Sequence, residues 1–61
     1  MKATQILNVK DAAEFVGLKP ATIYALVSAR RIPFLKIGRA VRFDSQDLTA
    51  WLESKRIPAI L

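Results

Sequence analysis

The chain has 61 residues, a net charge of +5 at pH 7, and neither Cys nor His. A domain of this length has a marginal core with little space for an internal pocket, so we expect that it is not an enzyme. The missing Cys and His exclude disulfides, a zinc site built from these ligands, and a thiol or imidazole catalytic group. We accordingly expect no cofactor and no metal.

Apolar residues make up 52% of the sequence, which predicts a folded domain and not a disordered chain. No stretch approaches the roughly 18 apolar residues of a membrane span, and residues 1–6 lack the apolar run of a signal peptide. We expect a cytoplasmic protein that does not associate with membranes and joins the nucleoid when it binds DNA.

The charges are unevenly distributed. Residues 15–43 contain no acid, and their six cations are Lys19, Arg30, Arg31, Lys36, Arg39 and Arg42. Such a field attracts polyanions, of which nucleic acid is the commonest. Charge alone is equally compatible with a solvated surface that keeps a small domain in solution.

The first predicted helix begins after Asn8, a good N-cap residue, and ends at Gly17. Its apolar stripe, at helical spacing, consists of Val9, Ala12, Ala13 and Val16. A second helix starts almost at once at Pro20, with Ile23, Leu26 and Val27 facing inward and Leu18 filling the angle between the helices. Two short helices joined by a three-residue turn with Gly match a helix-turn-helix.

The outward face of this second helix is small and uncharged: Ala21, Ala25 and Ser28, flanked by Thr22 and Tyr24. Such a face can bring its backbone close to a grooved surface. The alternative explanation for these alanines is structural, because Ala is the best helix former.

A period of two follows, with apolar Leu35, Ile37, Val41 and Phe43 at odd positions and Lys36 and Arg42 at even ones, which predicts a β-hairpin. If Ile37 opposes Val41, residues 38–40 form a three-residue loop with Arg39 at its tip. Gly usually takes the last position of such a loop, so the sequence leaves the register open.

A third helix is predicted after the N-cap Asp44, with Leu48, Trp51 and Leu52 facing inward to close the core. We expect Trp51 to be a core residue. The tail, residues 55–61, ends in an apolar cluster that either folds back on the core or docks on a partner.

The stretch "LNVKDAAEFVGLKPATIYALVSARRIPFLKIGRAVRFDSQDLTAWLES", residues 7–54, resembles the excisionase family of small MerR-like winged helix-turn-helix domains. The motifs that carry the resemblance are "DAAEFVGLKPATIY" and "RIPFLKIGRAVRFDSQDLTAWL". It implies a mostly α fold with a small β-hairpin wing, flanked by an N-terminal arm (1–6) and a C-terminal tail (55–61).

The resemblance also implies a DNA interface, with the second helix in the major groove and the hairpin on the neighbouring backbone or minor groove. The implied major-groove residues are Lys19, Ala21, Thr22, Tyr24, Ala25 and Ser28, and the wing residues are Lys36, Arg39 and Arg42. Arg30 and Arg31 join them as phosphate contacts by their charge. This chain has Lys19 where the family usually has Ser or Thr, and small Ala25 and Ala40 where larger or polar residues are common.

The outward helix face has no Arg, Asn or Gln, the usual bidentate readers of guanine and adenine, so we expect sequence-tolerant or moderately specific binding. The resemblance implies a recombination directionality factor that binds and bends attachment-site DNA, assisted by cooperative self-association and an integrase or recombinase. One alternative is a small transcriptional regulator with the same DNA-binding mode. Another is a protein-interaction adaptor that uses the basic face and the apolar tail.

Overall fold

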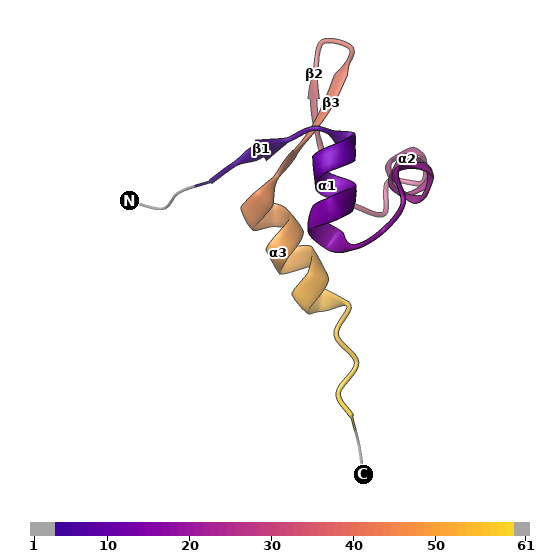
Figure 1. Ribbon diagram of the computed structural model, residues 1–61, viewed down its shortest axis with the longest axis vertical. Helices are drawn as coiled ribbons and strands as arrows, with labels where there is room; N and C mark the ends of the chain where they lie inside the picture. The colour runs from indigo at the N-terminus through magenta and orange to yellow at the C-terminus, as the bar shows by residue number, and fades with distance from the viewer. Residues whose placement is uncertain (1–3, 60–61) are drawn as a thin grey trace.

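A computed structural model describes residues 4–59 of the chain (Figure 1). Its elements are, in chain order, β1 (Ile6–Leu7), α1 (Val9–Val16), α2 (Pro20–Ser28), β2 (Leu35–Ile37), β3 (Ala40–Asp44) and α3 (Ser45–Ser54). The strands form one antiparallel sheet in the order β1-β3-β2. Three helices with a small sheet whose β2–β3 hairpin projects from the body confirm the predicted winged helix-turn-helix. No helix within residues 4–59 has the length and apolar character needed to cross a membrane.

Both ends of α1 lie where local sequence signals place them. The Asn8 side chain accepts a 2.8 Å hydrogen bond from the Asp11 N–H, which satisfies a donor of the first turn. At the other end Gly17 adopts a left-handed conformation, with φ of 78°, and the N–H groups of Gly17 and Leu18 both donate to the Ala13 carbonyl. The predicted N-cap and C-terminal glycine are confirmed.

The second helix begins at Pro20, as predicted, and packs against α1. Ile23 is fully buried together with Ala12 and Ala13, and these small alanines allow the two helices to approach closely. Leu18, which is expected to fill the angle between them, is 40% exposed, so it is only partly covered there.

The structure settles the hairpin register, which the sequence left open, with a shorter loop than the three-residue one considered above. Ile37 pairs with Ala40, and Lys36 pairs with Val41, so the loop contains only Gly38 and Arg39. Gly38 has a φ of 60°, and Arg39 does not share the positive φ, which is the pattern of a type II′ turn with glycine at its first central position. A two-residue loop reverses the parity of the alternation, so odd positions on β2 share a face with even positions on β3.

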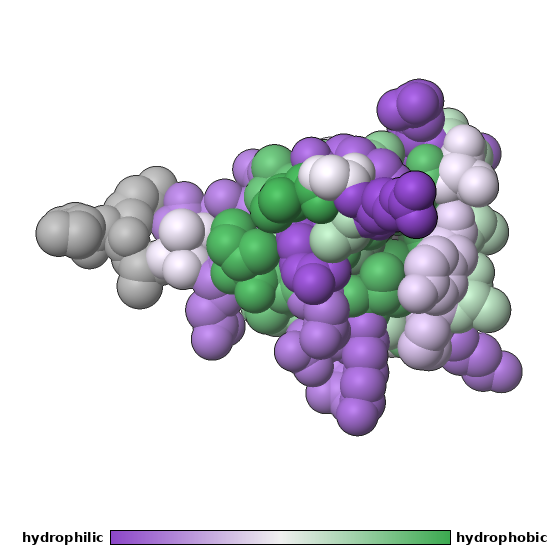
Figure 2. Space-filling model, turned by 90° about the horizontal axis from the view of Figure 1, so that it is seen from above, coloured by the Kyte–Doolittle hydropathy of each residue, from purple (hydrophilic) through white to green (hydrophobic). Residues whose placement is uncertain are grey.

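The two faces of the sheet therefore differ from the predicted ones. Phe43 is fully buried and Val41 half-buried on the inner face, whereas Leu35 and Ile37 lie on the outer face. Ile37 is 59% exposed. Figure 2, which looks down onto the hairpin, shows hydrophobic surface exposed between hydrophilic side chains. The four apolar residues at odd positions therefore divide between the two faces, and Ile37 does not oppose Val41.

Strand β1 was not predicted, and it connects the segment before α1 to the centre of the sheet. Leu7 pairs with Phe43, and Ile6 pairs with Asp44. The Thr4 hydroxyl donates a 2.7 Å hydrogen bond to Oδ1 of Asp44, and the backbone of residue 5 exchanges two further bonds with Ser45. Residues 4–6 are thus joined to the start of α3.

The third helix closes the core against β3 and α1. Its predicted N-cap is confirmed, because Oδ1 of Asp44 accepts a 2.8 Å hydrogen bond from the Gln46 N–H. Leu48 is fully buried, and Trp51 is half-buried against the core. Leu52 is 37% exposed, so its predicted inward position was wrong: the packed stripe of α3 is narrower than the apolar stripe of its sequence.

The tail leaves the body after α3 and extends away from it (Figure 1). Residues 55–59 are all exposed, and Ile57 is 87% exposed. This described part of the tail does not fold back on the core. The predicted apolar cluster also includes Ile60 and Leu61, which lie outside the described residues.

Candidate nucleic-acid interface

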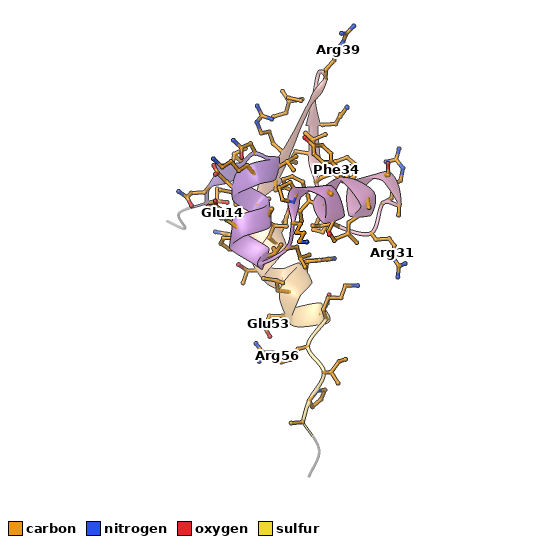
Figure 3. The ribbon with its side chains drawn as sticks, turned by 45° about the vertical axis from the view of Figure 1, so that its right-hand side comes forward. Glu14, Arg31, Phe34, Arg39, Glu53 and Arg56 are labelled. Atoms are coloured by element: carbon orange, nitrogen blue, oxygen red, sulfur yellow. The ribbon has the colours of Figure 1, made fainter. Side chains whose placement is uncertain are left out.

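Cationic and anionic side chains project from different parts of the fold. Figure 3 shows Arg39 beyond the tip of the hairpin and Arg31 beside the end of α2. Glu14 lies on α1, and Glu53 lies near the end of α3, where it forms a 2.8 Å ion pair with Arg56. Residues 19–42, which contain α2 and most of the β2–β3 hairpin, include six cations and no acid, so this stretch has positive charge that no acid within it offsets.

The predicted groove-facing side of α2 is open to solvent. All its members are exposed: Ala21, Thr22, Tyr24, Ala25 and Ser28. Tyr24 is 59% exposed, so its ring is not enclosed by α1, while Ile23 fixes the opposite side of the helix in the core. The helix thus presents a side with short side chains around one tyrosine, a shape that allows close approach to a grooved partner.

The N-terminus of α2 adds positive potential to this side. Lys19 occupies the N-cap position, is exposed, and makes no side-chain capping hydrogen bond. The N-terminal end of a helix carries partial positive charge and attracts anions, including phosphate. Lys19 therefore places a mobile ammonium group beside the helix end that a DNA phosphate would approach.

The three hairpin cations do not share one face. Arg39 is at the tip, as predicted. Lys36 pairs with Val41 on the inner face, which is turned toward α2. Arg42 pairs with Leu35 on the outer face, is half-buried, and donates a 2.8 Å hydrogen bond from Nη1 to the Val41 carbonyl. The sequence alternation placed Lys36 and Arg42 on one face, and the two-residue loop separates them.

The end of α2 is fixed by backbone hydrogen bonds around two arginines. The Arg30 N–H donates to the Val27 carbonyl at 3.0 Å, and the Arg31 N–H donates to the Leu26 carbonyl at 2.8 Å. Arg30 has a φ of 56° and is the only non-glycine residue among residues 4–59 with a positive φ. The side chains of both arginines are exposed.

A groove lies between the end of α2 and the hairpin. It is lined by Val27, Ser28, Arg30, Phe34, Lys36 and Val41. Ser28, Arg30 and Lys36 belong to the predicted site, and the structure brings them together. Phe34, Val27 and Val41 were not predicted as site residues. The signal that could have found Phe34 is its place between the helix end and the first hairpin strand.

Asp44 is the last residue of β3, and its carboxylate accepts hydrogen bonds from two neutral donors. The Thr4 hydroxyl and then the Gln46 N–H donate hydrogen bonds to the carboxylate, which lowers the pKa of Asp44 below its usual value. The carboxylate therefore serves the start of α3, away from the groove.

Comparison with known proteins gives one match. Residues 6–56 match the model of a helix-turn-helix domain family. No curated protein and no solved structure matches the chain. The matched segment contains α1, α2, the hairpin and α3, so it spans the whole arrangement described above. The chain belongs to this family of small helix-turn-helix DNA-binding domains, which includes excisionase-like proteins.

Proposed function

We propose that the chain binds double-stranded DNA with α2 in the major groove and the hairpin on the adjacent backbone or minor groove. The observation that carries this proposal is the pairing of an exposed, uncharged α2 face with a projecting cationic hairpin. The major groove admits an α-helix, and the short side chains of α2 allow it to enter deeply.

The residues divide into two groups by what they contact. Lys19, Arg30, Arg31, Lys36 and Arg42 bind phosphates and set the position of the protein, while Thr22, Tyr24 and Ser28 and the methyl groups of Ala21 and Ala25 meet base edges. Arg39 at the tip enters a narrow minor groove, where A·T-rich sequence deepens the negative potential. The outward face of α2 has no Arg, Asn or Gln that could read a base pair through two hydrogen bonds, so binding is moderately specific at most.

The biological role that we propose is that of an excisionase-like recombination directionality factor. Single DNA-binding modules bury only about 600–1,000 Å² of protein surface, so one copy binds weakly. Copies bound side by side would gain affinity cooperatively and bend the attachment site so that an integrase excises instead of inserting. This role rests on the resemblance of residues 7–54 and on the family match, and a transcriptional regulator would use the same interface.

The first test is fluorescence anisotropy with a labelled duplex pool at several salt concentrations. Neutralising five or six phosphates should give a slope of log K against log salt of roughly −4 to −6. Arg39→Ala should weaken binding and reduce the slope by about one. The matched control is Arg56→Ala, which also removes one positive charge but lies beyond α3 (Figure 3). If both variants weakened binding equally, the effect of Arg39→Ala would come from the lost net charge and not from a contact between the hairpin and DNA.

The second test separates the biological roles. A site selected from the pool is placed at varied positions in a set of DNA fragments, and gel mobility then reports bending. Bending, together with stimulation of excision when a candidate integrase is supplied in a recombination assay, supports the directionality factor. Promoter repression without either effect supports the regulator. Absence of DNA binding at low salt rejects both and leaves the adaptor, with its exposed tail, to be tested.

A further inference from the structure

The groove between α2 and the hairpin combines an apolar floor with a cationic rim. Val27, Phe34 and Val41 supply the floor, and all three are half-buried against the core. Ser28, Arg30 and Lys36 supply the hydroxyl and the two positive charges of the rim, and none of the six lining residues is acidic. The groove has a volume of about 530 Å³, within the range of roughly 300–1,000 Å³ that holds small ligands.

This chemistry fits one nucleotide of a DNA strand. A phosphate takes charge-assisted hydrogen bonds from a guanidinium, an ammonium and a hydroxyl, and the carbon face of the attached deoxyribose contacts an apolar surface. An apolar peptide would match the floor but would desolvate two unpaired cations at the rim. Charge complementarity therefore favours the nucleotide.

The backbone at Arg30 supports a role for its side chain. A φ of 56° places this residue in the left-handed region, where an L side chain is strained and glycine is not. The hydrogen bonds that end α2 here join only backbone atoms, so a glycine at position 30 could form them without the strain of an L side chain. The Arg30 side chain makes no hydrogen bond within this turn. It lines the groove instead.

We propose that this groove holds the phosphate and deoxyribose of one nucleotide of the bound DNA, and that Arg30 occupies a strained position because its guanidinium binds that phosphate. The inference rests on the proposed function and adds a site to it. In this proposal, Arg30 increases DNA affinity but lowers the stability of the fold. Phe34 is the residue that contacts the sugar.

The decisive variant is Arg30→Gly, which removes the side chain and relieves the backbone strain, so that loss of folding cannot explain a loss of binding. It should raise the melting temperature by about 4 °C. It should also weaken duplex binding about tenfold, as expected for one charge-assisted contact, and reduce the salt slope by about one. Arg30→Lys should retain most of the binding and gain no stability. Arg56→Gly, with the same loss of charge, should leave binding nearly unchanged.

A neutral methylphosphonate, moved one position at a time along the selected duplex, locates the phosphate. At one position it should weaken duplex binding by the wild-type protein, and it should weaken binding by Arg30→Gly clearly less, because only Lys36 and Ser28 still contact that phosphate in the variant. If the wild type binds DNA and Arg30→Gly binds equally well with the same slope, the groove proposal is wrong and the proposed function stands. If the wild type binds no DNA at low salt, both fail.

Nuclear magnetic resonance distinguishes other occupants. Signals of Phe34 and Val41 should shift when the duplex is added. Shifts on raising the protein concentration alone would assign the groove to a second copy of the chain, and overturn the proposal. Shifts with thymidine monophosphate, combined with duplex binding that Arg30→Gly does not alter, would assign it to a free nucleotide and overturn it as well.

Discussion

Nε1 of Trp51 donates a 2.9 Å hydrogen bond to the backbone carbonyl of Arg31, 20 residues earlier in the chain. This bond joins α3 to the segment that directly follows α2, while the indole ring packs against the core. Trp51 therefore has two roles: its ring packs against the core, and its hydrogen bond connects α3 to the segment that follows α2. The sequence predicted a core tryptophan but did not indicate this partner.

Trp51→Phe should destabilise the domain by about 1–2 kcal/mol, because it removes one hydrogen bond and part of the packed ring system. In a domain of this size each kcal/mol lost lowers the melting temperature by roughly 4–8 °C, which circular dichroism can measure. Lys55→Ala is the control, since it removes only the ammonium that lies 5.7 Å from the ring centroid. An effect of Lys55→Ala as large as that of Trp51→Phe would contradict the importance of the Arg31 bond.

Lys36→Ala should weaken DNA binding more than Arg42→Ala, although each removes one cation from the same hairpin. Lys36 lies on the face turned toward α2, and Arg42 lies on the outer face with its guanidinium bonded to the Val41 carbonyl. We expect the salt slope to decrease by about one for Lys36→Ala and by less for Arg42→Ala. Anisotropy titrations at several salt concentrations measure both. Equal slopes would place the DNA against both faces of the hairpin.

The boundaries of the helices could be predicted from the sequence because their signals are local. The Asn8 and Asp44 side chains cap the helices that follow them, Gly17 ends α1, and Pro20 begins α2, and each of these interactions involves only residues close by in the sequence. The position of Arg39 at the tip was predicted from a three-residue loop, and it holds in the two-residue loop as well because residue 39 belongs to both. These features need no knowledge of distant contacts.

The features that could not be predicted depend on contacts between distant parts of the chain. Strand β1 has only two residues and exists because it pairs with β3, nearly 40 residues away. The groove, likewise, arises only when the hairpin folds beside α2, which places Val41 on the same groove as Val27. The sequence left the hairpin register open for another reason: alternation fixes which residues of each strand share a face, but not the number of residues in the loop.

The stability of the domain should depend on the ionisation of Asp44 below pH 5. Its folded pKa is lowered, chiefly by the Thr4 hydroxyl, and the unfolded value is about 3.9. A depressed folded pKa means that this contribution is fully present above the unfolded value and is lost as the pH falls through the folded value. Asp44→Asn keeps the capping oxygen, because Asn caps about as well as Asp, but it cannot titrate. The stability difference between the wild type and this variant in urea should therefore shrink from pH 6 to pH 2.5. A difference that does not change with pH would reject this role.

The register of the hairpin can be tested by introducing threonine at two positions, one at a time. Ile37→Thr and Val41→Thr both retain a β-branched side chain, so strand propensity changes little in either. With the two-residue loop, Ile37 is 59% exposed on the outer face and Val41 is packed against the core. Ile37→Thr should alter the free energy of unfolding by less than about 0.5 kcal/mol, whereas Val41→Thr should cost about 1–2 kcal/mol, because it places a hydroxyl against apolar neighbours. A three-residue loop would pair the two residues on one face, and both variants would then be destabilised alike. Urea denaturation of the two proteins side by side distinguishes the registers.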